Sequence, residues 1–474
     1  MNRRFPKLLL PAAVVACCLF SVYLAASRPG YFNNYQTLAA LCFLQVLLAA
    51  IWNYRAGFLP LLLTIFLWAG MALPLNVAWT SGRWLVLCVG ALAGLFIYGS
   101  DQRCHFGSFH LIGLSCVVAA LVSAAASAYP NMALLKASSL LLLFLYAATG
   151  ARLAALGREA EFFSQLLVGC ELLVYITAIT YFAFKLPIFG NPNSLGAVMG
   201  VAAVPLLLWG TMSSGRTWVR RRRTLALLVA LLLLFSSYAR AGIAAAVVSC
   251  VLLCLALRQY GLLLRGAIVA VLLAVFVMTT LPLHEQPSGS LTTVFVYKGR
   301  QEDGLLASRR TAWDETVSSI QEHPWFGSGF GTSQTSSEVV EQPGGFESRR
   351  QATREHGNSY LALTEWVGLL GDLPFLALLI LIAANVARAV MQMRQTGNVF
   401  SHGVPLAGIM VAGLVHAGFE DWLFAPGYYL CVFFWALAFI MVDVVPAATP
   451  SASRSPQIAQ PVWARNFDGA PVTQ

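Results

Sequence analysis

Long apolar runs recur along almost the whole chain, and they restrict its possible folds more than any other feature. Each run is close to the length of about 20 residues that crosses about 30 Å of hydrocarbon as a helix. Of 474 residues, 58% are hydrophobic and 11% are charged, and the mean hydropathy is +0.71. A soluble domain has a charged fraction of about a quarter. The sequence therefore predicts an all-α, polytopic integral membrane protein.

The runs predict about fourteen membrane spans; three of the runs are short, so twelve is the alternative count. A single integral membrane domain would then occupy residues 1–445, followed by a disordered cytoplasmic tail, 446–474, which is rich in Pro, Ala and Ser. The predicted spans cover residues 8–26, 35–52, 58–73, 84–98, 109–128, 132–149, 164–184, 195–212, 225–240, 242–257, 266–283, 370–391, 404–420 and 427–445.

Basic residues in the short connectors predict the orientation, because such residues favour the cytoplasmic side. Arg3 and Arg4 precede the first run, which we interpret as an uncleaved span, and Arg220–Arg223 form the densest cluster. Both termini are then cytoplasmic. Residues 284–358 form one large outer loop, which we expect to contain short helices and to face the periplasm of a bacterium from its inner membrane. The net charge of +10 is explained by topology, and the chain has no nucleic-acid motif.

The outer loop carries a cationic pair and a histidine. Arg309 and Arg310 precede Thr311, which with Asp314 resembles a capping box and predicts a helix start. Guanidinium groups at a helix N-terminus suit phosphate, although they could equally lie on lipid headgroups. His356 could accept a proton near neutral pH, but a lone histidine is more often structural.

Two further signals lie at predicted outer ends of spans. Arg240, in Ser-Tyr-Ala-Arg-Ala-Gly, lies at membrane depth, where an arginine usually faces a cavity with a partner. The alternative is a side chain that reaches the headgroups. Gly242 would allow the backbone to approach a bulky anion. Asn191 and Asn193 flank Pro192 in a turn and helix-start pattern, and their amides could also meet sugar hydroxyls.

Polar residues after the loop complete the candidate site. Asn358 is positioned to cap the next helix, and we expect residues 359–367 to form a short interfacial helix before the 370–391 span. Glu365 lies in that helix. Asp421 and its neighbour Glu420 end an outward-going run, where they could bind a substrate hydroxyl, pair with Arg240, or form an ordinary interfacial charge pair. The outer connectors hold no zincin spacing, Cys cluster or Asp-x-Asp pair, so no metal and no cofactor is predicted.

Together these segments resemble the O-antigen ligase and polymerase superfamily. The resemblance spans residues 190–390, the family's core, and the order of the segments around one large loop carries its specificity. The matching segments are Gly190-Asn-Pro-Asn-Ser-Leu-Gly196, Ser236-Ser-Tyr-Ala-Arg-Ala-Gly242, Arg309-Arg-Thr-Ala-Trp313, His323-Pro-Trp-Phe-Gly-Ser-Gly-Phe-Gly331, His356-Gly-Asn358 and Glu365-Trp-Val-Gly-Leu-Leu-Gly371.

The resemblance implies an inverting, metal-independent glycan transfer from an undecaprenyl-diphosphate carrier to an acceptor hydroxyl on a glycan or lipid. By position, Arg240 and Arg309 would be catalytic arginines that stabilise the departing diphosphate, with Arg310 as the fallback for Arg309. His356 would be the loop histidine that accepts the hydroxyl proton, although Gly357 separates it from Asn358 where many members have His-Asn.

The partners implied are the lipid-linked donor, the acceptor and the bilayer, with other polysaccharide-assembly membrane proteins as candidates. The alternative from another class is a transporter or flippase of lipid-linked glycans. A transporter should place charged residues and broken helices near the membrane midplane, whereas the candidate residues here gather at one face. A non-enzymatic assembly scaffold is the third possibility, and it would leave the arginines and His356 dispensable.

Overall fold

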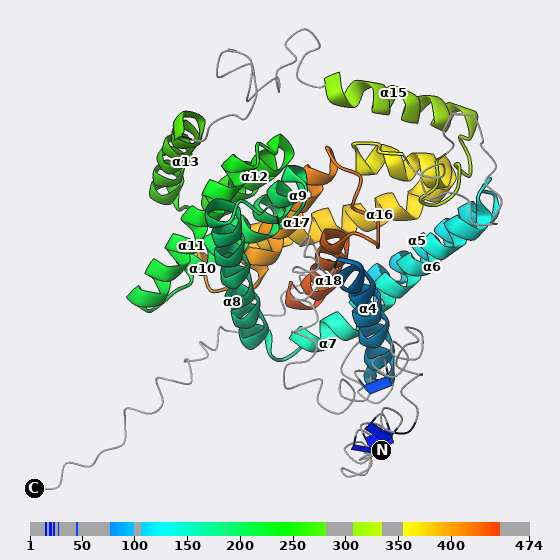
Figure 1. The fold of residues 1–474 in the computed structure, drawn as a ribbon, viewed down its shortest axis with the longest axis horizontal. Helices are drawn as coiled ribbons and strands as arrows, with labels where there is room; N and C mark the ends of the chain where they lie inside the picture. Colours follow the sequence, from blue (N-terminus) through cyan, green and yellow to red (C-terminus); the bar gives the residue numbers. More distant parts are fainter. Residues whose placement is uncertain are drawn as a thin grey trace, which may run out of the picture.

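The computed structural model describes residues 76–98, 106–186, 188–280, 307–333 and 354–445, with a few residues between 15 and 45. In these segments the chain forms helices and no strand, which confirms the all-α prediction (Figure 1). The elements are α4 (Asn76–Tyr98), α5 (Ser108–Ala125), α6 (Pro130–Tyr146), π-helical η3 (Ala147–Ala151), α7 (Arg152–Ala155), α8 (Glu159–Ala178), π-helical η4 (Ile179–Ala183), α9 (Pro192–Ala197), π-helical η5 (Val198–Ala203), α10 (Val204–Met212), α11 (Thr217–Ser236), α12 (Arg240–Ala256), α13 (Tyr260–Thr280), α15 (Ala307–Glu322), α16 (Ser359–Thr396), α17 (Gly403–Ala417) and α18 (Tyr429–Val444).

Several of these helices can cross a membrane, as the apolar runs predicted. Five continuous helical stretches among the described residues are long and apolar enough: Ser108–Ala125, Pro130–Ala155, Glu159–Ala183, Pro192–Met212 and Ser359–Thr396. Shorter apolar helices accompany them, including α12, α17 and α18. The three predicted spans between residues 8 and 73, and the predicted tail 446–474, lie outside the described residues apart from the few noted near the N-terminus.

The stretch from α9 through η5 to α10 forms the centre of the molecule. Most of it is buried within the protein rather than exposed to lipid. It packs against α12 through small residues, because a side chain on Gly200 would overlap the backbone of Gly242 and one on Gly242 would overlap the backbone of Gly196. Small residues allow such close helix approach in membranes. Gly242 therefore serves helix packing, and its expected approach to an anion stays a prediction.

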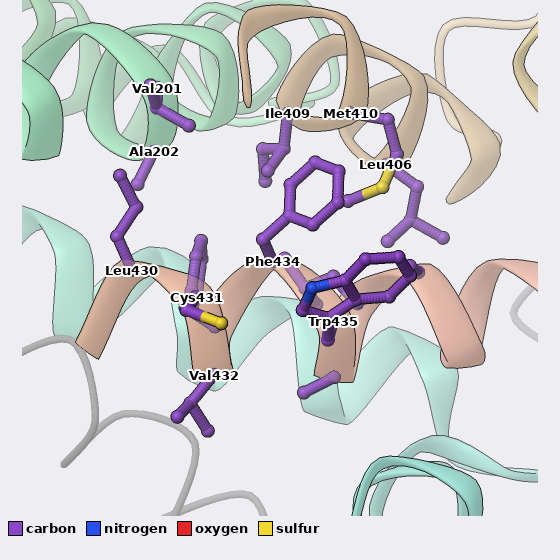
Figure 2. Packing of buried hydrophobic residues seen from close by; sticks show 14 of the residues in the cluster. Val201, Ala202, Leu406, Ile409, Met410, Leu430, Cys431, Val432, Phe434 and Trp435 are labelled. Atoms are coloured by element: carbon purple, nitrogen blue, oxygen red, sulfur yellow. The ribbon is translucent and has the colours of Figure 1, made fainter. Parts of the chain in front are cut away.

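Helix α18 provides much of the aromatic core (Figure 2). Phe434 lies against α17 near Ile409 and Met410, and the indole nitrogen of Trp435 donates a hydrogen bond to the Leu423 carbonyl over 2.7 Å. Both aromatic side chains are fully buried. This packing holds the connector between α17 and α18, which contains Asp421, against α18.

The basic cluster that anchors the predicted topology also makes an internal contact. In α11, Arg222 Nε lies 2.7 Å from Glu171 Oε2 and Arg223 Nε lies 3.2 Å from Glu171 Oε1 of α8. The Glu171 side chain is 6% exposed, and an acid buried this deeply requires compensating charge. Arg220 and Arg221 remain exposed, so only part of the cluster takes part in this helix pairing.

A break in α16 creates the platform for the outer loop. Gly368 has φ +68° and ψ 174°, so two helical pieces meet there at a kink. This confirms the predicted short helix before the 370–391 span. The Ser328 amide donates to the Glu365 carbonyl over 2.9 Å, and the Leu369 amide donates to the Pro324 carbonyl over 2.8 Å. The glycine-rich loop thus satisfies backbone groups that the break exposes.

The same loop is also tied to the turn between α5 and α6. Ser127 Oγ donates to the Ser328 carbonyl over 2.9 Å, and Lys136 Nζ bonds the Gly331 carbonyl. Residues 324–333 are therefore held between two membrane helices, and the end of this loop reaches His356.

Candidate active site around His356

His356 lies at the centre of a buried polar cluster. Its relative exposure is 1%. The ring atom Nδ1 lies 3.3 Å from Asp421 Oδ2, and Nε2 lies 3.1 Å from Glu365 Oε2 and 3.0 Å from Ser333 Oγ. The backbone amide of His356 also donates to Asp421 Oδ2 over 3.0 Å. Two carboxylates from different elements therefore contact the two nitrogens of one imidazole ring.

These carboxylates change the acid–base behaviour of the ring. Burial alone lowers the pKa of His356, but hydrogen bonds to Asp421 and Glu365 outweigh burial and raise the pKa above its ordinary value. Burial alone raises the pKa of Asp421, yet hydrogen bonds from the side chain and amide of His356 hold it below its ordinary value. Each of these two groups therefore stabilises the charged form of the other.

Arg309 lies beside this cluster, on the first turn of α15. Its Nη2 forms an ion pair with Glu420 Oε1 at 2.5 Å, and the two side chains are 20% and 17% exposed. Its guanidinium rests against Gly357, where an added Cβ would overlap it. Gly357 has φ +64°, a conformation that glycine adopts without strain. The glycine between His356 and Asn358 therefore makes room for the arginine.

Helix α15 begins earlier than the sequence indicated. The predicted start at Thr311 is wrong, because the helix already includes Ala307. Arg309 and Arg310 are consequently inside the first turn, and a helix places consecutive residues on different faces. The Arg310 side chain is exposed, whereas Arg309 turns toward Glu420. The geometry favours Arg309 over Arg310 as the cation of this site.

The start of α16 supplies the other wall. Asn358 is its N-cap, and its side-chain oxygen accepts from the amides of Tyr360 and Leu361 over 2.9 and 3.3 Å, as the sequence predicted. Glu365, about two helical turns further along, is 1% exposed and forms an ion pair with Arg354 as well as the contact with His356. Asn358 thus has a structural role, and Glu365 belongs to the polar cluster.

Arg240 occupies the first position of α12, after the left-handed residue Tyr238 at φ +50°. It is half-buried. Asp421 binds His356 and Glu420 binds Arg309, and the suggested pairing of these acids with Arg240 stays a prediction.

Asn191 and Asn193 lie at the start of α9. Asn191 is exposed and is the N-cap of α9, because its side-chain oxygen accepts from the Asn193 amide over 2.8 Å. The close contact between Gly196 and Ala239 brings the starts of α9 and α12 together. The turn interpretation of this motif is confirmed, while a contact with sugar stays a prediction.

The residues around Arg240 and the cluster around His356 lie at the same end of the helical bundle. At the start of α18, Tyr429 Oη donates to the Ser194 carbonyl of α9 over 3.4 Å. The neighbouring ring of Tyr428 is close enough to Glu420 and Asp421 to be influenced by their charges. The start of α18 therefore bridges the α9–α12 corner, which carries Arg240, to the His356 cluster.

Two members of the cluster were not assigned a site role from the sequence: Arg354 and Ser333. Arg354 is two residues before His356, so proximity to an assigned residue was the available signal. Ser333 had no such signal. Among the described residues, no group of three or more His, Cys, Asp or Glu side chains is arranged to hold a metal ion.

The fold and site define an all-α, multi-pass membrane protein with an arginine-lined, histidine–carboxylate site at one end of its helical bundle. Residues 225–356 match the family model described as O-antigen ligase. The matched segment contains Arg240, Arg309 and His356. The match confirms the resemblance seen in the sequence motifs and supports membership of the O-antigen ligase superfamily, a family of membrane glycan ligases and polymerases. No curated protein matches the chain.

Proposed function

We propose that the protein transfers a glycan from an undecaprenyl-diphosphate carrier to an acceptor hydroxyl. The family match at residues 225–356 supports this class of reaction, and the observation that carries it is the cluster in which Arg309 adjoins the His356–Asp421 pair. A group-transfer site of this kind needs a cation for the leaving diphosphate and a base for the attacking hydroxyl. The cluster supplies both.

In the proposed reaction, the acceptor oxygen attacks the anomeric carbon of the donor as the bond from that carbon to the diphosphate oxygen breaks. The carbon inverts, and undecaprenyl diphosphate leaves with the bonding electron pair. Arg309 and Arg240 stabilise the negative charge that develops on the diphosphate, because guanidinium groups bind phosphate oxygens in pairs. The lipid tail stays between membrane helices.

The hydroxyl proton passes to the His356–Asp421 pair. The Asp421 side chain is 27% exposed and the His356 side chain 2%, so the carboxylate is the member nearer to an incoming hydroxyl. A proton delivered to this pair remains stabilised by the second carboxylate, Glu365, at Nε2 of the ring. The raised pKa of His356 makes the pair a stronger base once it is deprotonated.

The proposed setting is the inner membrane of a bacterium, with both termini cytoplasmic and the site on the periplasmic face. The arginine distribution supports this orientation. Single cysteines placed at exposed Arg310 and exposed Arg221, in a background without the native cysteines, test it. A membrane-impermeant maleimide should label position 310 in intact spheroplasts and position 221 only after the membrane is opened. The reverse labelling pattern would overturn the orientation.

The test of function uses purified protein in nanodiscs with an undecaprenyl-diphosphate glycan and an acceptor glycan or lipid. Release of undecaprenyl diphosphate together with a larger acceptor is expected from the wild type. Arg240→Ala, Arg309→Ala and His356→Ala should each lower the rate about 10²-fold or more, the usual cost of removing a group that stabilises developing charge.

Arg310→Ala is the matched control, because it removes an equal charge from an exposed neighbouring position, and it should stay within about threefold of wild type. Movement of the glycan across the bilayer without release of the lipid diphosphate would instead support the transporter. Wild-type rates in all three site variants would remove the proposed assignment.

A further inference from the structure

Arg354 bridges two helices and takes no part in the proposed chemical step. Its side chain is 11% exposed and forms an ion pair with Glu365 Oε2. The same nitrogen, Nη2, also donates to Thr316 Oγ1 over 3.1 Å, and Nη1 lies 3.2 Å from Glu315 Oε2. Thr316 and Glu315 belong to α15. One guanidinium therefore joins α15 to the start of α16.

The carboxylate that Arg354 binds is the one that orients His356. Glu365 Oε2 accepts from Arg354 and also lies 3.1 Å from His356 Nε2. The other oxygen, Oε1, is buried and has no hydrogen-bond partner among the described residues. Both cations therefore share a single oxygen of an acid whose side chain is 0% exposed, and a buried carboxylate is strongly dependent on its partners.

We infer that Arg354 is a positioning residue, which holds Glu365 against Nε2 of His356. It also links that carboxylate to α15, the helix that carries Arg309. Arg354 acts through Glu365 and need not touch substrate. The inference rests on the proposed function for its catalytic meaning, whereas the ion pairs and hydrogen bonds of Arg354 carry its geometry.

The charges around the ring decide what loss of Arg354 would do. The groups that face this region are Arg309 and Glu315 from α15, Arg354 and Glu355 from the segment before α16, Glu365 from α16, and Glu420 and Asp421 from the connector after α17. Arg309 is engaged by Glu420. Without Arg354, the buried Glu365 would have His356 as its remaining close cation, and the ring would hold its proton more tightly.

The first measurement is the pH profile of kcat/KM for Arg354→Gln and Arg354→Lys. Arg354→Gln should move the acid limb to higher pH by about one unit or more, the usual effect of one charge at contact distance. Arg354→Lys keeps the charge, so its acid limb should stay near that of the wild type. The double variant Arg354→Gln/Glu365→Gln removes both partners and should return the limb toward the wild-type position. Arg310→Gln is the matched control and should not move it.

The second measurement follows the His356 ring by NMR with 13C-labelled histidine, assigned from the signal lost in His356→Gln. The titration should shift upward in Arg354→Gln and not in Arg354→Lys. Unchanged titrations in Arg354→Gln would overturn the inference whatever the activity. If wild-type protein shows the NMR pattern but releases no lipid diphosphate, the proposed function fails and the positioning role of Arg354 stands.

Whether the Arg354 and Glu365 variants fold provides a third test of the inference. If Arg354→Gln does not fold, the cause should be an uncompensated Glu365 charge, and the double variant should fold and titrate as above. A double variant that also fails, beside a folded Glu365→Gln protein, would contradict the inference because the loss would then be independent of the carboxylate.

Discussion

Arg309 and Glu420 form an ion pair across the mouth of the site, with Nη2 and Oε1 separated by 2.5 Å. The pair is partly exposed, and the arginine is the cation proposed to bind diphosphate. A carboxylate already occupies part of its guanidinium fork. Substrate phosphate and Glu420 should therefore compete for Arg309.

Removal of that competitor should strengthen anion binding. We expect Glu420→Gln to bind undecaprenyl diphosphate about tenfold more tightly, equivalent to about 1.4 kcal/mol, as measured by equilibrium binding in detergent micelles. Burial raises the pKa of Glu420 even though Arg309 opposes the shift, so the wild-type affinity should also improve as the pH falls and Glu420 becomes protonated. Glu322→Gln removes an exposed carboxylate from the same helix as Arg309 and serves as the control. Weaker binding in Glu420→Gln would show that Glu420 orients Arg309 instead.

The pH dependence of stability and of activity should have opposite signs. His356 has a folded-state pKa above its ordinary value of about 6.5. Its stabilising contribution is therefore fully present below about pH 6.5 and lost as the pH rises through the folded-state pKa. The apparent Tm of the wild type, compared with His356→Gln at one scan rate, should show a larger advantage at about pH 6 than at about pH 9. Transfer activity needs the deprotonated pair, so it should rise over the same interval. An advantage that grows with pH would contradict the charge assignment.

Asp421 has the reverse behaviour, because its pKa is held below the ordinary value. Its stabilising contribution is present above about pH 3.9, the ordinary value for an aspartate, and is lost as the pH falls through the folded-state pKa. The stabilising contributions of His356 and Asp421 to folding should therefore both be present in mildly acidic solution.

The break in α16 should be sensitive to a single methyl group. Gly368 has φ +68°, and a Cβ there would overlap the backbone of Trp325. Gly368→Ala should cost about 3 kcal/mol, because its φ and ψ lie in a region that is essentially restricted to glycine and the loop must also move. Gly397→Ala is the control, since Gly397 has φ +61° and open space around it. Apparent Tm values for the two variants provide the comparison, and equal losses would show that the contact with Trp325 contributes little.

The asparagine before α9 separates a structural role from a role in binding. Asn191→Ala should lose the cap, at a cost of about 1 kcal/mol. Asn191→Asp keeps the acceptor oxygen and removes the amide donor, so we expect wild-type stability and transfer activity within about twofold. Thermal unfolding measures the stability of each variant, and release of the lipid diphosphate measures its transfer activity. Normal stability with lost transfer in Asn191→Asp would instead support a contact with sugar.

Local signals were sufficient for much of the helical framework. The Asn358 cap and the break before the 370–391 span were both predictable, because caps and helix breaks depend on residues close in sequence. The start of α15 was not. The capping-box pattern at Thr311 was overridden, and the helix extends back to Ala307.

By itself, the sequence determined the class of the protein, since apolar runs that match the bilayer thickness leave helices as the available structure. It also indicated the residues from which a site would be built. Only the tertiary structure decided their pairing: Arg309 meets Glu420 across 111 positions, and His356 meets Asp421 across 65. No local pattern specifies such partners, because buried charges are matched by whichever opposite charge helix packing brings within reach.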